Sequence, residues 1–129
     1  MKKYELTTET KDYLGRTLYR IRALIDFEFA NAGELGGWIE KEENLAQEGN
    51  AWVSGNARVF EDAEVYGNAR VYDDAEVYGN ARVYGNARVS GDAEVYGDAR
   101  VSGNARVSGN VEVYGNARLS GNAWVFGKE

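Results

Sequence analysis

Thirteen consecutive six-residue repeats, which run from Gly49 to Phe126, constrain the fold of this 129-residue chain more than any other feature. Each repeat follows the pattern Gly-Asn-Ala-x-Val-y, and no insertion or deletion interrupts the series. A fixed short period is typical of stacked architectures, in which each repeat contacts its neighbours and a continuous core is buried between them. We therefore expect a solenoid over this part of the chain.

The third and fifth positions of the repeat predict the inner face. The third position is Ala in twelve of the thirteen repeats, with Val111 as the exception, and the fifth is Val in twelve, with Leu119 as the exception. Two residues that are two apart on a strand point to the same side, so both positions face inward. The fourth and sixth positions, which are Arg, Glu or Trp and then Tyr, Ser or Phe, must face outward.

The first two positions predict a corner after each strand. They are Gly-Asn or Gly-Asp in eleven repeats, and these residue types tolerate the positive φ angles that tight corners need. Strands this short, with a corner every six residues, do not make a hairpin sheet. They fit a coil that stacks on itself, and three repeats per coil predict an all-β fold, a triangular parallel β-helix.

The pattern resembles that of the hexapeptide-repeat family, whose members carry an aliphatic residue every six positions with a small residue two before it. The resemblance implies a left-handed helix, a handedness that the period alone does not give. It covers residues 49–126 and extends weakly to residues 43–48. We therefore expect a β-helix over residues 43–129. The first matching positions are Val53, Val59 and Val65, preceded by Ala51, Ala57 and Ala63.

Residues 1–42 are not repetitive and predict an N-terminal β-rich cap. Lys3–Thr7 and Arg16–Ile25 have strand-like patterns and are expected to form a hairpin. A cap would cover the unpaired backbone groups at the first edge of the solenoid, and the alternative is a dedicated binding or dimerisation domain. The GELGGWIE segment at Gly33–Glu40, followed by the repeats, is similar to small proteins of bacteriophages and mobile elements, which implies a phage setting.

A coil of eighteen residues stacks every third repeat, so the chain has three outer walls. One wall combines an aromatic column with a glutamate column, and we predict that it is a contact surface. Like charges opposite each other on adjacent strands destabilise a sheet, and above Arg58 nothing on this wall neutralises them. Solenoid packing and solubility alone are the alternative explanation. The predicted contact residues of this wall are Phe60, Tyr78, Tyr96, Tyr114, Glu76, Glu94 and Glu112.

A second copy of the chain is one expected partner of this wall. Tyr, Trp and Arg are enriched at interfaces and at their hot spots. The glutamate column would dock on an arginine column of another subunit, formed by Arg70, Arg88 and Arg106, and build a closed homo-oligomer, a trimer or a dimer. A host protein is the other expected partner.

The enzymatic roles known in the hexapeptide-repeat family do not carry over to any position of this chain. Its acyltransferases use a histidine general base, and its carbonic anhydrases hold zinc with three histidines. The chain contains no His and no Cys, which removes the usual zinc ligands and any Ser-His or Cys-His nucleophile. We therefore predict that it is not an enzyme, with no catalytic residue, no metal site and no cofactor.

The sequence favours a non-catalytic binding or scaffold protein that makes protein contacts through the outer walls of a β-helix. One alternative is a phage-encoded inhibitor that blocks a host defence protein or sequesters its signal molecule, and another is a degenerate acyltransferase-like protein. The net charge of −6 argues against direct nucleic-acid binding. The lack of a signal peptide or a long apolar segment predicts a cytoplasmic protein without membrane contact.

Overall fold

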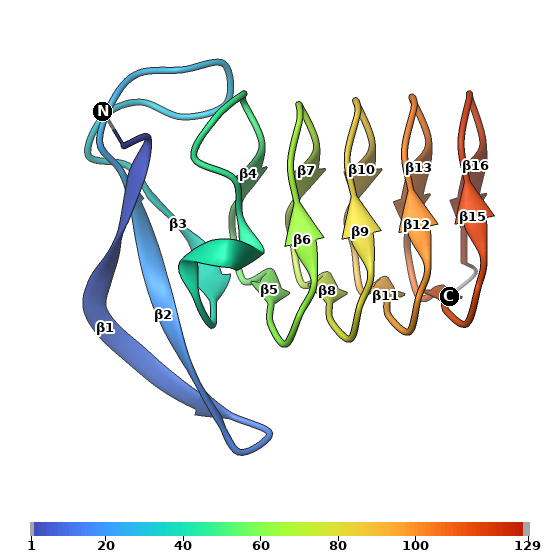
Figure 1. Cartoon of the computed structure of the whole chain (residues 1–129), viewed down its shortest axis with the longest axis horizontal. Helices are drawn as coiled ribbons and strands as arrows, with labels where there is room; N and C mark the ends of the chain where they lie inside the picture. The colour runs from blue at the N-terminus through green and yellow to red at the C-terminus, as the bar shows by residue number, and fades with distance from the viewer. Residues whose placement is uncertain (1, 128–129) are drawn as a thin grey trace.

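The computed structural model describes residues 2–127 and is all-β apart from one 3-10 turn, η1 (Glu42–Asn44). Thirteen short strands follow one another along a parallel solenoid, and a hairpin lies at its N-terminal end (Figure 1). Lys128 and Glu129, with which the expected β-helix ends, lie outside the described residues. The solenoid strands are β4 (Trp52–Val53), β5 (Arg58–Val59), β6 (Glu64–Val65), β7 (Arg70–Val71), β8 (Glu76–Val77), β9 (Arg82–Val83), β10 (Arg88–Val89), β11 (Glu94–Val95), β12 (Arg100–Val101), β13 (Arg106–Ser108), β14 (Glu112–Val113), β15 (Arg118–Leu119) and β16 (Trp124–Phe126).

Every third strand pairs in parallel, which gives three sheets with strand orders β5-β8-β11-β14, β4-β7-β10-β13-β16 and β6-β9-β12-β15. The registers join residues eighteen apart, such as Arg70 with Arg88 and Arg88 with Arg106. The predicted all-β parallel solenoid with three repeats per coil is therefore confirmed. The left hand and the triangular cross-section stay predictions.

The inner face consists of the alanines and valines that the repeat predicts. Those of residues 51–107 are all at most 1% exposed, so the core is a continuous column of small side chains. Val113 is 6% exposed, and Ala117 and Leu119 beyond it are only partly buried. The repetition of Ala and Val keeps successive coils the same width, so that backbone hydrogen bonds can form at every level.

The backbone hydrogen bonds between coils follow one pattern in each repeat. Asn68, Arg70 and Tyr72 donate their N–H groups to the carbonyls of Gly85, Ala87 and Val89 in the next coil. The N–H groups of the second, fourth and sixth repeat positions therefore point toward the C-terminal end of the solenoid, and the carbonyls of the first, third and fifth positions point toward the preceding coil. These carbonyls of the first coil consequently need donors from outside the repeats.

The corners of the solenoid require left-handed backbone. Gly85, for example, has a φ of 67° and lies against Gly103 of the next coil. Two repeats begin with a residue other than glycine, and Glu61 and Asp73 there still adopt φ angles of 59° and 60°. Their carboxylates accept hydrogen bonds from backbone N–H groups one coil further on, at 2.8 and 3.1 Å, which ties these strained corners to their neighbours.

Two glycine substitutions separate backbone strain from crowding between coils. A Cβ at position 85 would lie 2.9 Å from the Gly103 nitrogen, whereas one at position 121 would meet nothing within 4 Å, although its φ is 59°. We expect Gly121→Ala to lower the free energy of unfolding by about 1–2 kcal/mol, the strain of left-handed backbone. Gly85→Ala should lower it by clearly more. Urea unfolding would measure both, and equal losses would contradict the crowding argument.

The N-terminal segment forms a hairpin whose first strand is longer, and whose second strand is shorter, than the sequence predicts. β1 (Tyr4–Tyr13) and β2 (Arg16–Ala23) pair antiparallel. A third strand, β3 (Leu35–Ile39), pairs antiparallel with β2 and parallel with β5. The cap therefore continues one sheet of the solenoid, and parallel stacking begins at β3, ahead of the expected boundary between residues 42 and 43.

The cap supplies the donors that the first coil lacks. The buried Lys3 ammonium donates to the Ala51 carbonyl at 2.7 Å, and the backbone N–H of Trp38 donates to the Ala57 carbonyl at 3.0 Å. The fully buried Asn44 amide donates to the Ala63 carbonyl at 2.9 Å. One donor thus reaches the first alanine carbonyl of each sheet, two from residues 1–42 and one from Asn44 in η1.

The weak extension of the repeat to residues 43–48 has a different register from the one expected. An eighteen-residue coil would place Leu45 beside Ala63, but Leu45 forms a parallel bridge with Val65. Trp38 and Arg58 are likewise twenty residues apart in their pairing. Two additional residues therefore separate the cap from the regular coils, and Leu45, 1% exposed, occupies a valine position of the core.

Asn44 should be among the most sensitive polar residues of the chain. Its amide nitrogen donates to two carbonyls and its amide oxygen accepts the N–H groups of Glu40 and Lys41. We expect Asn44→Ala to lower the free energy of unfolding by about 3 kcal/mol, because buried polar groups lose their partners. Asn86→Ala, in an exposed asparagine ladder, is the matched control and should cost about 1 kcal/mol or less. Similar losses in urea unfolding would argue against the capping role.

Candidate functional site

The outer face of β5, β8, β11 and β14, called the glutamate wall from here on, carries two parallel ladders. Glu94 lies directly opposite Glu76 on one side and Glu112 on the other. Beside these glutamates, the rings of the aromatic column stack at centroid distances of 5.0, 5.0 and 5.4 Å from Phe60 to Tyr114. The predicted columns are therefore present in the predicted register.

The two ladders of the glutamate wall are joined by hydrogen bonds. The Tyr78 hydroxyl donates to Glu94 at 2.8 Å, and the Tyr96 hydroxyl donates to Glu112 at 2.7 Å. Each tyrosine thus reaches the glutamate of the next coil. These bonds give each carboxylate one donor on one of its two oxygens and leave the negative charge in place, since a neutral phenol carries no compensating charge.

The carboxylates change the acidity of the tyrosines. The hydrogen bond to Glu112, together with partial desolvation and the Glu112 charge, raises the pKa of Tyr96 to about 12. Burial, followed by the hydrogen bond to Glu76, raises the pKa of Tyr13 to about 12. Burial and the bond to Glu94 raise the pKa of Tyr78 well above its ordinary value. The phenols therefore stay protonated donors throughout the neutral range.

The Tyr96–Glu112 bond predicts an alkaline titration. Glu112→Gln removes the charged acceptor, so the pKa of Tyr96 should fall from about 12 toward its ordinary value of 10. Because the pKa is raised on folding, this pair stabilises the fold fully below pH 10, and that stabilisation is lost as the pH rises through about 12. Phenolate absorbance, assigned with Tyr96→Phe, measures the shift.

The control for this titration is Glu64→Gln. Glu64 is exposed and lies on a different sheet from the tyrosines of the glutamate wall. This variant should leave the Tyr96 titration unchanged. An unchanged pKa of Tyr96 in Glu112→Gln would show that the carboxylate does not set it.

The hairpin covers the first level of the glutamate wall. Phe60 is only 2% exposed, because it packs against Leu18 and Trp38 and meets the edge of the Tyr13 ring at 5.7 Å. The prediction that Phe60 is an exposed contact residue is therefore wrong. The register of the hairpin cannot be predicted from the sequence, so nothing indicated that Leu18 and Tyr13 lie against this ring.

Glu76 is neutralised at the same level. Its carboxylate accepts the Tyr13 hydroxyl at 2.7 Å and forms an ion pair with Arg58 at 2.8 Å, and the side chain is 14% exposed. Above this level the wall is open. Glu94 is half-buried, Glu112 is exposed, and Tyr114 is 58% exposed. The accessible part of the glutamate wall therefore lies on β11 and β14.

The outer face of β4, β7, β10, β13 and β16, the first arginine wall, carries the predicted basic column. The Arg70 guanidinium lies over the Phe29 ring at 4.5 Å and over Tyr72 at 5.3 Å. Arg106 lies 5.9 Å from the centre of the Trp124 ring. The structure thus forms the expected column, but the arginines at two of its three levels stack on aromatic rings of the same chain.

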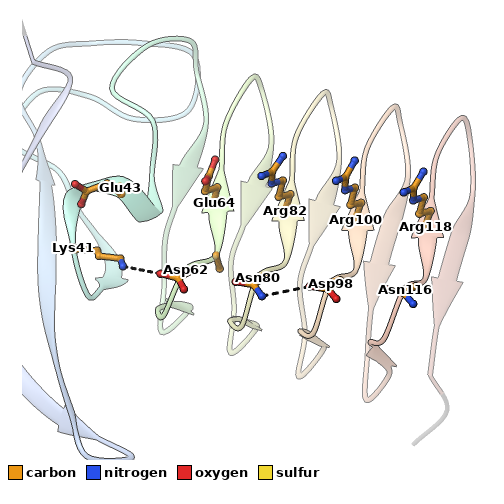
Figure 2. Close-up of a pocket in the computed structure, with 11 residues that line it drawn as sticks. Lys41, Glu43, Asp62, Glu64, Asn80, Arg82, Asp98, Arg100, Asn116 and Arg118 are labelled. Atoms are coloured by element: carbon orange, nitrogen blue, oxygen red, sulfur yellow. Dashed lines mark hydrogen bonds and ion pairs between the residues drawn. The ribbon is translucent and has the colours of Figure 1, made fainter.

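The outer face of β6, β9, β12 and β15, the second arginine wall, carries a basic column that the sequence analysis did not single out. Arg100 lies opposite Arg82 and Arg118 in register, and Figure 2 shows the three side chains pointing the same way. They line a hollow of about 900 Å³. None of the three forms an ion pair within residues 2–127. The repeat period is enough to predict that these three arginines form a column, but it does not predict the hollow beside them.

Other polar groups line this hollow along its whole length, and among them Asp98 lies in the same repeat as Arg100. Lys41 and Asp62 form an ion pair at 3.0 Å, and Glu64 lies opposite Arg82 on the neighbouring strand. The amide of Asn80 donates to Asp98 at 3.4 Å (Figure 2). Positive charge therefore dominates toward β12 and β15. In the described part of the chain, no group of three or more His, Cys, Asp or Glu side chains is placed to hold a metal ion.

Comparison with known proteins identifies the repeats. Residues 63–79, 75–91, 81–97, 93–109 and 99–115 match the model of the YdcK Beta solenoid repeat. A relative, the Uncharacterized acetyltransferase YdcK of Escherichia coli (strain K12), is 39% identical over 61 residues, which are 41% of this chain and 19% of the relative. The chain thus matches about a fifth of that protein. No helix within residues 2–127 has the length and apolar character that a membrane crossing requires.

Proposed function

We propose that this chain, whose hexads are repeats of the hexapeptide-repeat β-solenoid family, is a non-catalytic binding protein that assembles with further copies of itself through its outer walls. The observation that carries the proposal is the segregation of charge. The accessible end of the glutamate wall is acidic, and both other walls carry columns of arginine. Like charges opposite each other on neighbouring strands destabilise a sheet, and a complementary surface removes that penalty.

The exposed tyrosines support the same proposal. Tyr114 is 58% exposed beside Glu112, and Tyr96 stacks on it at 5.4 Å. Tyrosine contributes a large contact area with few rotatable bonds, and it is enriched among interface hot spots. Two tyrosines held by stacking and by hydrogen bonds to glutamate form a preorganised contact surface. The contact joins different walls of two copies, so it is heterologous and favours a closed ring.

A catalytic role has less support. The printed name of the Escherichia coli relative suggests acyl transfer, but the similarity extends over about a fifth of that protein. This chain contains neither His nor Cys, which excludes a histidine general base and a cysteine nucleophile. The carboxylates of the glutamate wall are engaged by tyrosine hydroxyls on an outer face. We therefore propose binding, and no reaction step.

The test of self-assembly is the mass in solution by light scattering after size exclusion, for the native chain and for Tyr96→Ala with Tyr114→Ala. We expect an oligomer for the native chain that weakens at high salt, because screening reduces the attraction of exposed charges. The double variant should keep its circular dichroism and associate at least ~10-fold more weakly, as expected for the loss of hot-spot side chains. Tyr72→Ala, at the same repeat position of the first arginine wall, is the control.

Two outcomes of this experiment would redirect the proposal. A native chain that is monomeric at every salt and protein concentration would contradict self-assembly. It would leave the glutamate wall free for a foreign protein, as expected for an inhibitor of a host defence protein. An oligomer that the double variant leaves unchanged would show that the tyrosines of the glutamate wall lie outside the interface.

A further inference from the structure

We infer that the surface receiving the glutamate wall is the second arginine wall of another copy, where Glu94 and Glu112 would meet Arg100 and Arg118. This inference rests on the proposed self-assembly and names its second surface. It differs from the sequence-based expectation, which paired the glutamates with the first arginine wall. The spacing of the charges and their height along the solenoid favour another copy of the chain as the partner. The state of each arginine column and the hollow favour the second arginine wall over the first.

The spacing of the charges favours another solenoid as the partner. Both columns repeat once per coil, at the distance between neighbouring strands, about 4.8 Å. An extended peptide presents same-side residues at about twice 3.4 Å, so its charges fall out of step with this ladder after one or two levels. A column of glutamates on a second copy of the chain has the matching repeat at every level.

The heights of the charges favour a closed assembly. Glu94 precedes Arg100 by six residues, and Glu112 precedes Arg118 by six, so each pair belongs to the same coil. Six residues are a third of a coil, which corresponds to a rise of about 1.6 Å at the strand spacing. Two copies with parallel axes therefore bring each glutamate close to the level of its arginine without sliding along the axis. A heterologous contact without such a slide closes into a ring.

Both columns carry less net charge near the cap. On the glutamate wall, Glu76 is already paired with Arg58 at 2.8 Å. On the second arginine wall, the first strand carries Glu64, which lies opposite Arg82 without forming an ion pair with it. Beyond this end, Glu94 and Glu112 on one wall and Arg100 and Arg118 on the other form no ion pair within residues 2–127.

The first arginine wall is a weaker candidate for contact with the glutamate wall, because two of its arginines already contact aromatic rings of their own chain. Arg70 and Arg106 stack on aromatic rings of their own chain, whereas no aromatic contact of this kind involves Arg82, Arg100 or Arg118 within residues 2–127. The second arginine wall also has the hollow of about 900 Å³, lined by these three arginines, into which the tyrosines beside the glutamates can pack (Figure 2).

Charge reversal tests the inference directly. We expect Arg100→Glu with Arg118→Glu to weaken self-association at least ~100-fold, because it places like charges face to face at two levels. Arg88→Glu with Arg106→Glu, the same change at the same repeat position of the first arginine wall, is the matched control and should keep the native mass. The fold accepts these changes, because the fourth position of the repeat is naturally Arg or Glu.

A charge swap completes the test. Glu94→Arg with Glu112→Arg should also dissociate the oligomer, and the chain carrying all four changes should associate again, since the opposite charges are restored with their positions exchanged. Sedimentation velocity at low salt would measure each mass, and circular dichroism would check the fold.

The outcomes separate this inference from the proposed function. Dissociation by Arg88→Glu with Arg106→Glu, but not by Arg100→Glu with Arg118→Glu, would overturn the inference while self-assembly stands. Failure of the four-change chain to associate would also overturn it. A native chain that stays monomeric under all conditions would overturn both the proposed self-assembly and the inference.

Discussion

The structure depends on the ladder of backbone hydrogen bonds between coils. The N–H groups of the second, fourth and sixth repeat positions donate to the coil that follows, so the matching carbonyls of the first coil have no donor from the repeats. The cap solves this with three unrelated donors, the Lys3 ammonium, the Trp38 backbone N–H and the Asn44 side-chain amide. The lack of repetition in the N-terminal segment follows from this task, because each carbonyl needs a donor at a different place.

Burial of Lys3 illustrates the demands of the first coil. Desolvation lowers its pKa to about 8, and its ammonium is held by the carbonyls of Ala51 and Gly49 and lies 5.1 Å from the Phe27 ring centre. Because the pKa is lowered on folding, the unfavourable contribution of this burial is fully present below pH 8 and disappears as the pH rises toward 10.5. The chain tolerates it because the alternative is an unpaired buried carbonyl.

The repeat period predicted the core and the outer columns of the solenoid, but it did not predict the contacts of the non-repetitive N-terminal segment. Two positions in six determined the core, and the eighteen-residue coil placed Glu76, Glu94 and Glu112 on one wall in the observed register. Leu45 was misplaced because two extra residues separate the cap from the first regular coil, and an irregular segment contains no period that could reveal them. Phe60 was misjudged because its partners, Leu18 and Trp38, come from that same segment.

The cap also decides which parts of the outer walls remain free. Tyr13 of the hairpin and Arg58 together take up Glu76, and the hairpin shields Phe60, so the glutamate wall is occupied at the end where the solenoid begins. Lys41, just after β3, holds Asp62 at the cap end of the second arginine wall. The same segment that supplies the first donors of the hydrogen-bond ladder therefore also pairs with acidic side chains at the cap end of two walls. Glu94 and Glu112 on one wall, and Arg82, Arg100 and Arg118 on another, form no ion pair within residues 2–127. These columns are the part of the surface that a second solenoid with the same coil spacing fits.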